Sequence, residues 1–210
     1  SSSAASDVYK RQVLNHMDYE GEYGLIMCFS DPKQNFRKEV LSTYKGNRAG
    51  KLKPVCYGAV RQWVEDRYDC VSYPTLEADD CVGLLADKYK GHEVHISGDK
   101  DFKTIPGVFF DFLHDGWFEI SEEQAYKNFL AQVMIGDAAD NYKGCPGIGP
   151  KTADKVLEKY GVGWKTVVDQ FKKVGLSEGE ALQQARVAHI LNKEEEYDVC
   201  KYKVTLWNPN

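Results

Sequence analysis

The strongest constraint on this sequence is the placement of its acidic residues, which gather in four short segments at the ends of predicted strands or helices. Massed carboxylates repel one another, so a fold tolerates them where cations bind among them, and their oxygens suit Mg²⁺ or Mn²⁺. The pattern therefore indicates a metal-dependent site for phosphoryl transfer. The candidate metal ligands are Asp31; Glu77, Asp79 and Asp80; Asp99 and Asp101; and Asp137 with Asp140.

Each acidic cluster also has an ordinary structural explanation. Asp79 and Asp80 would cap a helix N-terminus, where the helix dipole favours acids. The segment SGDKDF would be an acidic turn after a strand, and the acids of GDAADN would mark a solvated helix end. The joint arrangement favours the metal site, because independent accidents would have to place every cluster at the end of a strand or helix.

Short apolar runs alternate with helical patterns over the first half of the chain. Strands are predicted at residues 25–29, 70–73 and 94–97, and amphipathic helices at 54–68 and 78–90. This alternation predicts an α/β fold with a mainly parallel central sheet flanked by helices. Ligands bind at the carboxyl ends of the strands in such sheets, which is where the acidic clusters fall.

Beyond Ser121 the pattern is helical, and residues 144–161 predict a hairpin between two helices. Gly147 and Gly149 would let backbone amides approach a phosphate, and the N-terminus of the following helix favours the anion. Two polar residues, Lys151 and Thr152, would add side-chain contacts. A G-x-G sequence alone is weak evidence, but with the apolar stripe that follows it matches the helix-hairpin-helix signature for sequence-independent binding of the DNA backbone.

A basic segment lies between the first two predicted strands. Residues 33–61 hold eight Lys or Arg and one acid, a local charge of +7 in a chain of net charge −5. Arg37, Lys38 and Tyr44 combine cations with an aromatic ring, which suits a nucleic-acid backbone with stacked bases. A solvated basic loop is the alternative, and the adjacent metal site makes the nucleic-acid interpretation the stronger one.

The cysteines and the N-terminal segment bear on the setting of the protein. Six cysteines without C-x-x-C spacing indicate neither a zinc site nor a disulfide framework, so we expect reduced thiols in a cytoplasm. No apolar run approaches the roughly 18 residues of a membrane span. Residues 1–12 show no periodicity, and DVYKRQ resembles the translation of a transposon end used in sequencing libraries. We expect this segment to be non-native and leave it out of the fold prediction.

Five motifs, taken in order, resemble the flap endonuclease and 5′→3′ exonuclease family, most closely the exonucleases of T-odd phages. They are FSDPKQNFRKEVLSTYKGNR, LEADD, SGDKDF, MIGDAADNYKG and PGIGPKTA. The resemblance implies a PIN-like α/β nuclease core over residues 13–120 and a helical region with the helix-hairpin-helix over 121–210. The family begins with a strand that carries a metal-ligand aspartate. Because nothing before Leu25 supplies one, we expect the first strand of the core to be absent.

The resemblance also implies roles for individual residues in a two-metal nuclease that uses Mg²⁺ or Mn²⁺. Glu77, Asp79, Asp80 and Asp99 resemble ligands of one metal, Asp101, Asp137 and Asp140 those of a second, and Asp31 an acid after the family's second core strand. Lys45 and Arg48 resemble the basic residues that contact the scissile phosphate, within an arch or clamp over residues 36–53. The hairpin would hold duplex or flap DNA and, as in relatives, a K⁺ ion.

The expected function is a phage-type 5′→3′ exonuclease or flap endonuclease that acts on DNA, or on RNA primers in hybrids, during replication beside other replication proteins. Two other functions stay open. One is a DNA-binding module of the same fold without catalysis, and the other is a PIN-like ribonuclease. Mg²⁺-dependent release of nucleotides from a duplex would distinguish the nuclease from the DNA-binding module. A preference for single-stranded RNA would favour the ribonuclease.

Overall fold

The computed structural model describes residues 23–48, 50, 52–114 and 116–209. The segment 1–12 that the sequence analysis set aside, and the residues up to 22 where a first strand would be sought, lie outside the described part. The strands within it hydrogen-bond in three groups.

Two parallel strand pairs are present. Strand β1 (Ile26–Cys28) pairs in parallel with β2 (Asp69–Val71), and β3 (Val94–Ser97) pairs in parallel with β4 (Gly107–Asp111). Strand β5 (Gly116–Ile120) then adds to β4 in the antiparallel direction. The mixed α/β class is therefore confirmed, while β4 and β5 form a hairpin that the sequence analysis did not predict.

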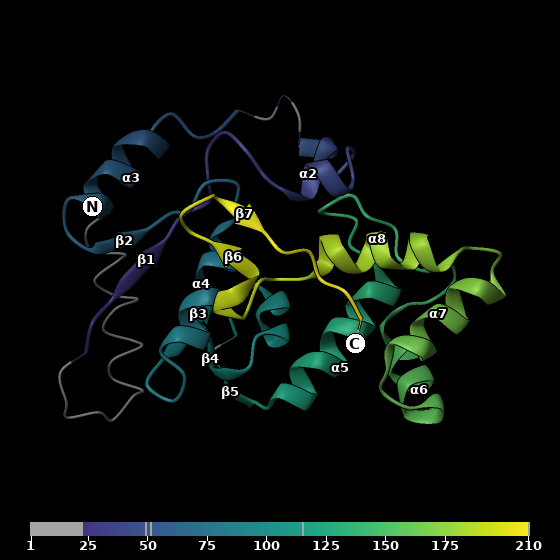
Figure 1. The fold of residues 1–210 in the computed structure, drawn as a ribbon. Helices are drawn as coiled ribbons and strands as arrows, with labels where there is room; N and C mark the ends of the chain where they lie inside the picture. Colours follow the sequence, from purple (N-terminus) through teal and green to yellow (C-terminus); the bar gives the residue numbers. More distant parts are fainter. Residues whose placement is uncertain (1–22, 49, 51, 115, 210) are drawn as a thin grey trace.

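Helices surround these strands and make up most of the C-terminal half. The helices are α2 (Arg37–Val40), α3 (Tyr57–Glu65), α4 (Ala78–Lys88), α5 (Glu122–Ile135), α6 (Pro150–Tyr160), α7 (Trp164–Lys173) and α8 (Glu178–Ala188). Short 3₁₀ turns lie at η1 (Gly46–Arg48), η2 (Lys100–Thr104) and η3 (Glu194–Glu196), and a small hairpin joins β6 (Tyr197–Asp198) to β7 (Lys203–Val204). In Figure 1 the pair β1 and β2 lies with α3 at one end of the molecule, and α6 and α7 lie at the other.

Helix starts follow the local capping rules. The Ser121 hydroxyl accepts a hydrogen bond from the Gln124 amide at 3.1 Å and so caps α5, at the point where the helical pattern begins. Ser177 and Glu180 form a capping box at the start of α8. Helix α7 was not predicted, because Gly163 precedes it without a side-chain cap and its first turn contains no acid.

The described part of the chain has three clusters of buried apolar side chains, and the smallest includes Phe36 and Leu76. Helices α5 to α8 pack around Leu130, Val133, Leu157 and Phe171, which are all at most 1% exposed. A second cluster under the strands includes Phe109, which is fully buried. Burial of such side chains contributes roughly 1.5–3 kcal/mol each, so both halves of the chain have their own core.

One buried polar side chain lies in the second core. His95 of β3 is 4% exposed and stacks on Phe109 at 5.6 Å between ring centres. Neither of its ring nitrogens has a hydrogen-bond partner within the described part of the chain. Burial disfavours the charged ring and lowers the pKa of His95 from 6.5 to about 4.

We therefore predict an acid-sensitive contribution to stability from His95. Between about pH 4 and pH 6.5 His95 is protonated in the unfolded chain but neutral in the folded protein. The free energy of unfolding therefore falls by about 1.4 kcal/mol for each pH unit below 6.5, until about pH 4. Above pH 6.5 His95 has no such effect. Urea unfolding at several pH values should show a shallower decline for His95→Phe, while the exposed His92→Gln should follow the wild type. Equal pH dependence in all three proteins would contradict the assignment.

Candidate active site

The loop between β2 and α4 brings the first acidic cluster into place, and Asp31 holds that loop. The Asp31 carboxylate accepts hydrogen bonds from the amides of Thr75 and Lys33, both at 2.8 Å. The Ser30 hydroxyl accepts the Ala78 amide at 3.0 Å. The hydrogen bonds from the Thr75 and Lys33 amides hold the pKa of Asp31 below its usual range. The Asp31 oxygens thus anchor the backbone on which α4 begins, and the expectation that Asp31 also binds metal stays a prediction.

Asp80 and Arg37 form a buried ion pair. Asp80 is 0% exposed and Arg37 is 2% exposed. Two guanidinium nitrogens of Arg37 lie 2.7 Å from the two carboxylate oxygens of Asp80, which also accept the amides of Glu77 and Leu191. The prediction of Asp80 as a metal ligand and that of Arg37 as a DNA contact are both corrected, since each group already has its partners inside the protein.

Tyr44 is likewise a buried residue rather than a stacking surface for bases. It is 2% exposed, and its hydroxyl oxygen lies 2.8 Å from the Glu77 carboxylate and 2.9 Å from that of Asp140. This corrects the DNA-stacking prediction for Tyr44. The hydroxyl links an acid at the start of α4 to an acid in the loop after α5, so two of the predicted clusters do meet in space.

Two predicted phosphate contacts lie against the same acids. The Lys45 ammonium bonds the Glu77 carboxylate and lies 3.6 Å from Asp140. The Arg48 guanidinium lies 2.6 Å from the other oxygen of Asp140. Lys45 has a φ of 52°, a strained conformation that directs the chain around Glu77. Both cations stand where a phosphate beside the acidic cluster would need them.

Two asparagines that the sequence analysis missed fasten this segment to the acidic loop. The Asn141 side chain donates to the Thr43 carbonyl at 2.7 Å, and the Asn47 side chain donates to the Ala138 carbonyl at 2.9 Å. Both lie inside quoted motifs, YKGNR and GDAADN, so the signal was present. It was overlooked because only charged side chains were considered there.

The carboxylates of Asp79 and Asp101 both have raised pKa values. Burial, and then the charges of neighbouring acids that include Asp99, raise the pKa of Asp79 to about 7. Burial, then Asp99 and further acids raise the pKa of Asp101 to about 6. The negative charge of Asp99 therefore acts on both Asp79 and Asp101. The acids that follow β3 thus lie close to the acids at the start of α4. The acids that the structure brings together are Glu77, Asp79, Asp99, Asp101, Asp137 and Asp140.

This cluster fits divalent cations through its chemistry. Among the described residues no three acidic, histidine or cysteine side chains already converge in a ready-made metal site. Instead, Lys45 pairs with Glu77, and Lys100, which the sequence analysis also missed, lies 3.9 Å from Asp137. The pKa values of Asp79 and Asp101 are raised first by burial and then by the neighbouring acids, so negative charge remains beside these lysines. Hard carboxylate oxygens are the ligands that Mg²⁺ prefers.

The loop that carries Asp137 and Asp140 depends on two glycines. Asp137 and Tyr142 exchange backbone hydrogen bonds at 2.8 and 3.0 Å, which closes the loop. Gly136 and Gly144 have φ of +72° and +63°, and the backbone of each lies where a Cβ of the other would be. The close approach leaves no room for a side chain at either position.

We predict that Gly136→Ala destabilises the protein by about 2 kcal/mol or more, because the new methyl group meets the backbone of Lys143 and Gly144. Gly179→Ala in α8 is the matched control, since its nearest neighbour is 3.7 Å away, and it should stabilise by roughly 0.5–1 kcal/mol. Chemical unfolding of the three proteins measures both changes. An unchanged free energy of unfolding for Gly136→Ala would contradict the role given to this glycine.

The predicted hairpin lies at the start of α6. Gly147 has a φ of +81°, and Gly149 precedes the helix without a side-chain cap. A Cβ at either glycine would meet nothing within 4 Å, so the approach to the helix N-terminus is open. Lys151 and Thr152 in the first turn are exposed. The DNA-binding role of these four residues and of the exposed Lys38 stays a prediction.

The acidic cluster with its adjacent cations defines a site for phosphoryl transfer on an α/β fold. Residues 4–125 match the family model of the 5′-3′ exonuclease N-terminal resolvase-like domain. The exodeoxyribonuclease of Enterobacteria phage T3 is 30% identical over 223 residues, covering 88% of this chain and 73% of the relative. The exonuclease of Escherichia phage T7 is 29% identical, with 88% and 74% covered.

The chain therefore belongs to the 5′-3′ exonuclease family, as its motifs indicated. Its fold is similar to that of the T5 5′-exonuclease with bound divalent metal ions, with a TM-score of 0.68, 20% identity, and 90% of this chain and 81% of that one covered. The family match begins within the segment 1–12, which is outside the described residues. No helix in the described part of the chain is long and apolar enough to cross a membrane.

Proposed function

We propose that this protein is a metal-dependent 5′→3′ exonuclease and flap endonuclease that hydrolyses phosphodiester bonds of DNA. The observation that carries the proposal is the meeting of three separate acidic segments with Lys45 and Arg48 at one place. Carboxylates supply metal ligands and the two cations supply a counter-charge to phosphate oxygens. Membership of the 5′-3′ exonuclease family, with relatives in phages T3 and T7, supports the same activity.

Two groups of acids would hold two divalent ions, Mg²⁺ with Mn²⁺ as a substitute. Glu77, Asp79 and Asp99 form one group, and Asp101, Asp137 and Asp140 form the other. When bound, such ions lower the pKa of water and stabilise charge on the attacking and leaving oxygens of an in-line displacement. Asp80 is not among the proposed ligands, because Arg37 and two backbone amides occupy its oxygens. Asp31 remains a proposed ligand beside these groups.

The residues of the chain position the phosphodiester. Lys45 and Arg48 are tied to Glu77 and Asp140, and a phosphate would compete with these carboxylates for both cations. The Tyr44 hydroxyl keeps Glu77 and Asp140 at hydrogen-bonding distance from one oxygen, so it orients one acid of each metal group. Cleavage with this geometry would leave a 5′ phosphate on the product.

The substrate would be duplex or flap DNA, including RNA primers in hybrids, without sequence preference. Lys38 and the hairpin residues Gly147, Gly149, Lys151 and Thr152 would contact the backbone, and the hairpin carbonyls would hold K⁺ as the family resemblance implies. A DNA polymerase I of Rhizobium leguminosarum is 33% identical over 152 residues, covering 65% of this chain and 15% of the relative. This relative supports work beside other replication proteins. The relatives in phages T3 and T7 support a setting in the cytoplasm of an infected bacterium.

We predict that the protein releases nucleotides from a 5′-labelled flap duplex in Mg²⁺, and that EDTA abolishes the release. Asp79→Asn should lower the cleavage rate at least about 100-fold, because it removes a proposed metal ligand. Its binding to the same DNA in EDTA, followed by fluorescence anisotropy, should change little.

Glu122→Gln is the matched control, since Glu122 is an exposed acid that pairs with Lys90 away from the cluster. It should cleave like the wild type. Undiminished cleavage by Asp79→Asn would remove this residue from the site. Wild-type binding without cleavage would favour a DNA-binding module, and faster turnover of single-stranded RNA would favour a ribonuclease.

A further inference from the structure

Hydrogen bonds to backbone carbonyls join the segment around η1 to the acidic loop after α5. The Asn141 side chain of the loop donates to the Thr43 carbonyl at 2.7 Å. In the opposite direction, the Asn47 side chain of η1 donates to the Ala138 carbonyl at 2.9 Å. Each segment therefore sends one asparagine side chain to the backbone of the other. We call these two asparagines and their two carbonyl partners the asparagine clasp.

Further hydrogen bonds lie between the two contacts of the clasp. The Lys45 amide donates to the Asp140 carbonyl at 2.8 Å, and the Arg48 guanidinium donates to the Ala139 carbonyl at 3.3 Å. Lys45 and Asn141 have φ of 52° and 61°, in the left-handed region that residues other than glycine rarely adopt. Such conformations persist only where the surrounding contacts hold them. The clasp therefore surrounds a backbone that needs support.

The clasp differs from the ion pairs beside it, because its acceptors are carbonyl oxygens. Lys45 bonds the Glu77 carboxylate. The Arg48 guanidinium lies 2.6 Å from the Asp140 carboxylate. A phosphate at the cluster would compete with these carboxylates for both cations, but it would not compete for a hydrogen bond between a neutral amide and a carbonyl. The side chains of Lys45 and Arg48 can therefore change partners while their backbone stays in place.

Asparagine suits this position for two reasons. Its side-chain amide donates hydrogen bonds without carrying charge, whereas a lysine or arginine would neutralise acids that are proposed to bind cations. It also tolerates the left-handed conformation found at Asn141 better than most residues do. Both Asn47 and Asn141 are exposed, so neither side chain is needed to fill an apolar core.

We propose that Asn47 and Asn141 are positioning residues for the proposed cleavage reaction. They fix the backbone of Lys45 and Arg48 relative to the acidic loop, so that both cations meet the scissile phosphate without a rearrangement of the chain. The inference rests on the proposed function. Charges that are already in place stabilise a transition state without a cost of reorganisation. A displacement of about 1 Å can lower the rate about 100-fold.

The first measurement follows the clasp itself, in EDTA and without DNA. The clasp variant combines Asn47→Ala with Asn141→Gly, because glycine accepts the left-handed conformation while it removes the side chain. Hydrogen–deuterium exchange reports on the Lys45 amide, which the Asp140 carbonyl protects. Exchange at Lys45 should be at least about 10-fold faster in the clasp variant than in the wild type, because the turn opens more often.

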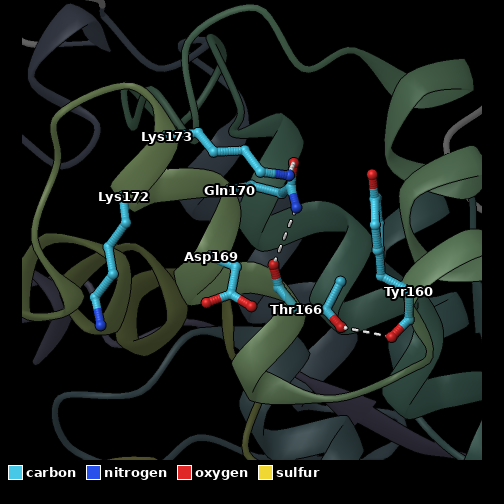
Figure 2. A pocket seen from close by; sticks show the side chains of 6 residues that line it. All are labelled: Tyr160, Thr166, Asp169, Gln170, Lys172 and Lys173. Atoms are coloured by element: carbon cyan, nitrogen blue, oxygen red, sulfur yellow. Dashed lines mark hydrogen bonds between the residues drawn. The ribbon is translucent and has the colours of Figure 1, made fainter.

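Thr166→Val is the matched control, because it also removes a side-chain donor to backbone carbonyls. Figure 2 shows Thr166 beside Tyr160, where the Thr166 hydroxyl donates to the carbonyls of Tyr160 and Gly161 at 3.3 and 2.8 Å. This contact joins α6 to α7 and lies outside the acidic cluster. Exchange at Lys45 in the control should equal that of the wild type. Urea unfolding of all three proteins measures how much stability each change costs.

The second measurement is cleavage of the 5′-labelled flap duplex in Mg²⁺. The clasp variant should lose about 10- to 100-fold in kcat, because Lys45 and Arg48 no longer stand at a fixed place beside the acids. Its KM, and its affinity for the same DNA in EDTA, should stay close to those of the wild type, since the clasp is proposed to orient the cations and not to hold the duplex. The control should keep the wild-type kcat.

Equal exchange at Lys45 in the wild type and the clasp variant would overturn the inference. An unchanged kcat in a clasp variant with faster exchange would do the same, and so would an equal loss of kcat in Thr166→Val. Each of these results leaves the proposed nuclease function intact, because the wild type would still cleave. Failure of the wild type to cleave in Mg²⁺ would instead contradict the proposed function, and with it the positioning role, whatever the exchange shows.

Discussion

The buried ion pair between Arg37 and Asp80 is the interaction on which the rest of the structure depends. The Arg37 side chain also donates to the carbonyls of Val187 and His189 at 2.9 and 2.6 Å, at the end of α8. Asp80 in turn accepts the amide of Leu191. One pair of side chains therefore ties the basic segment, the start of α4 and the helical C-terminal region together. Removing one partner of such a pair leaves an uncompensated buried charge, which costs about 3–5 kcal/mol.

The same pair sets the geometry of the acidic cluster. The Glu77 amide donates to Asp80 at 3.0 Å, and the Arg37 guanidinium lies 3.4 Å from the Glu77 carboxylate. The chain that leaves Arg37 then carries Tyr44 and Lys45 over Glu77. Acids from α4 and from the loop after α5 meet under this segment because a buried charge pair holds its beginning in place.

Much of the fold could be predicted because its signals are local. The run VHIS forms β3 over the predicted residues, and α5 begins directly after Ser121, where the helical pattern starts, since such patterns depend on neighbouring residues. The β4–β5 hairpin and α7 were missed. Helix α7 begins after Gly163 without a capping side chain, so the sequence carried no start signal there.

The site was predicted in composition but not in every role. Asp79 and Asp101 do lie in one acidic cluster, because the segments that follow β2 and β3 come together although the two strands belong to different sheets. Arg37 and Asp80 resembled an exposed cation and a metal ligand, and only their contact across the fold shows that they neutralise each other. Sequence does not distinguish a buried charge from an exposed one when its partner lies 43 positions away.

The most direct test of this account is a double-mutant cycle on the buried pair, measured as the free energy of unfolding in urea. Arg37→Met and Asp80→Leu should each cost about 3–5 kcal/mol, because each leaves a buried charge without its bidentate partner. The double variant should be more stable than the sum of the two losses predicts, with a coupling energy of at least about 2 kcal/mol. Losses that add to within about 0.5 kcal/mol would show that the two residues do not depend on each other, and would contradict the account.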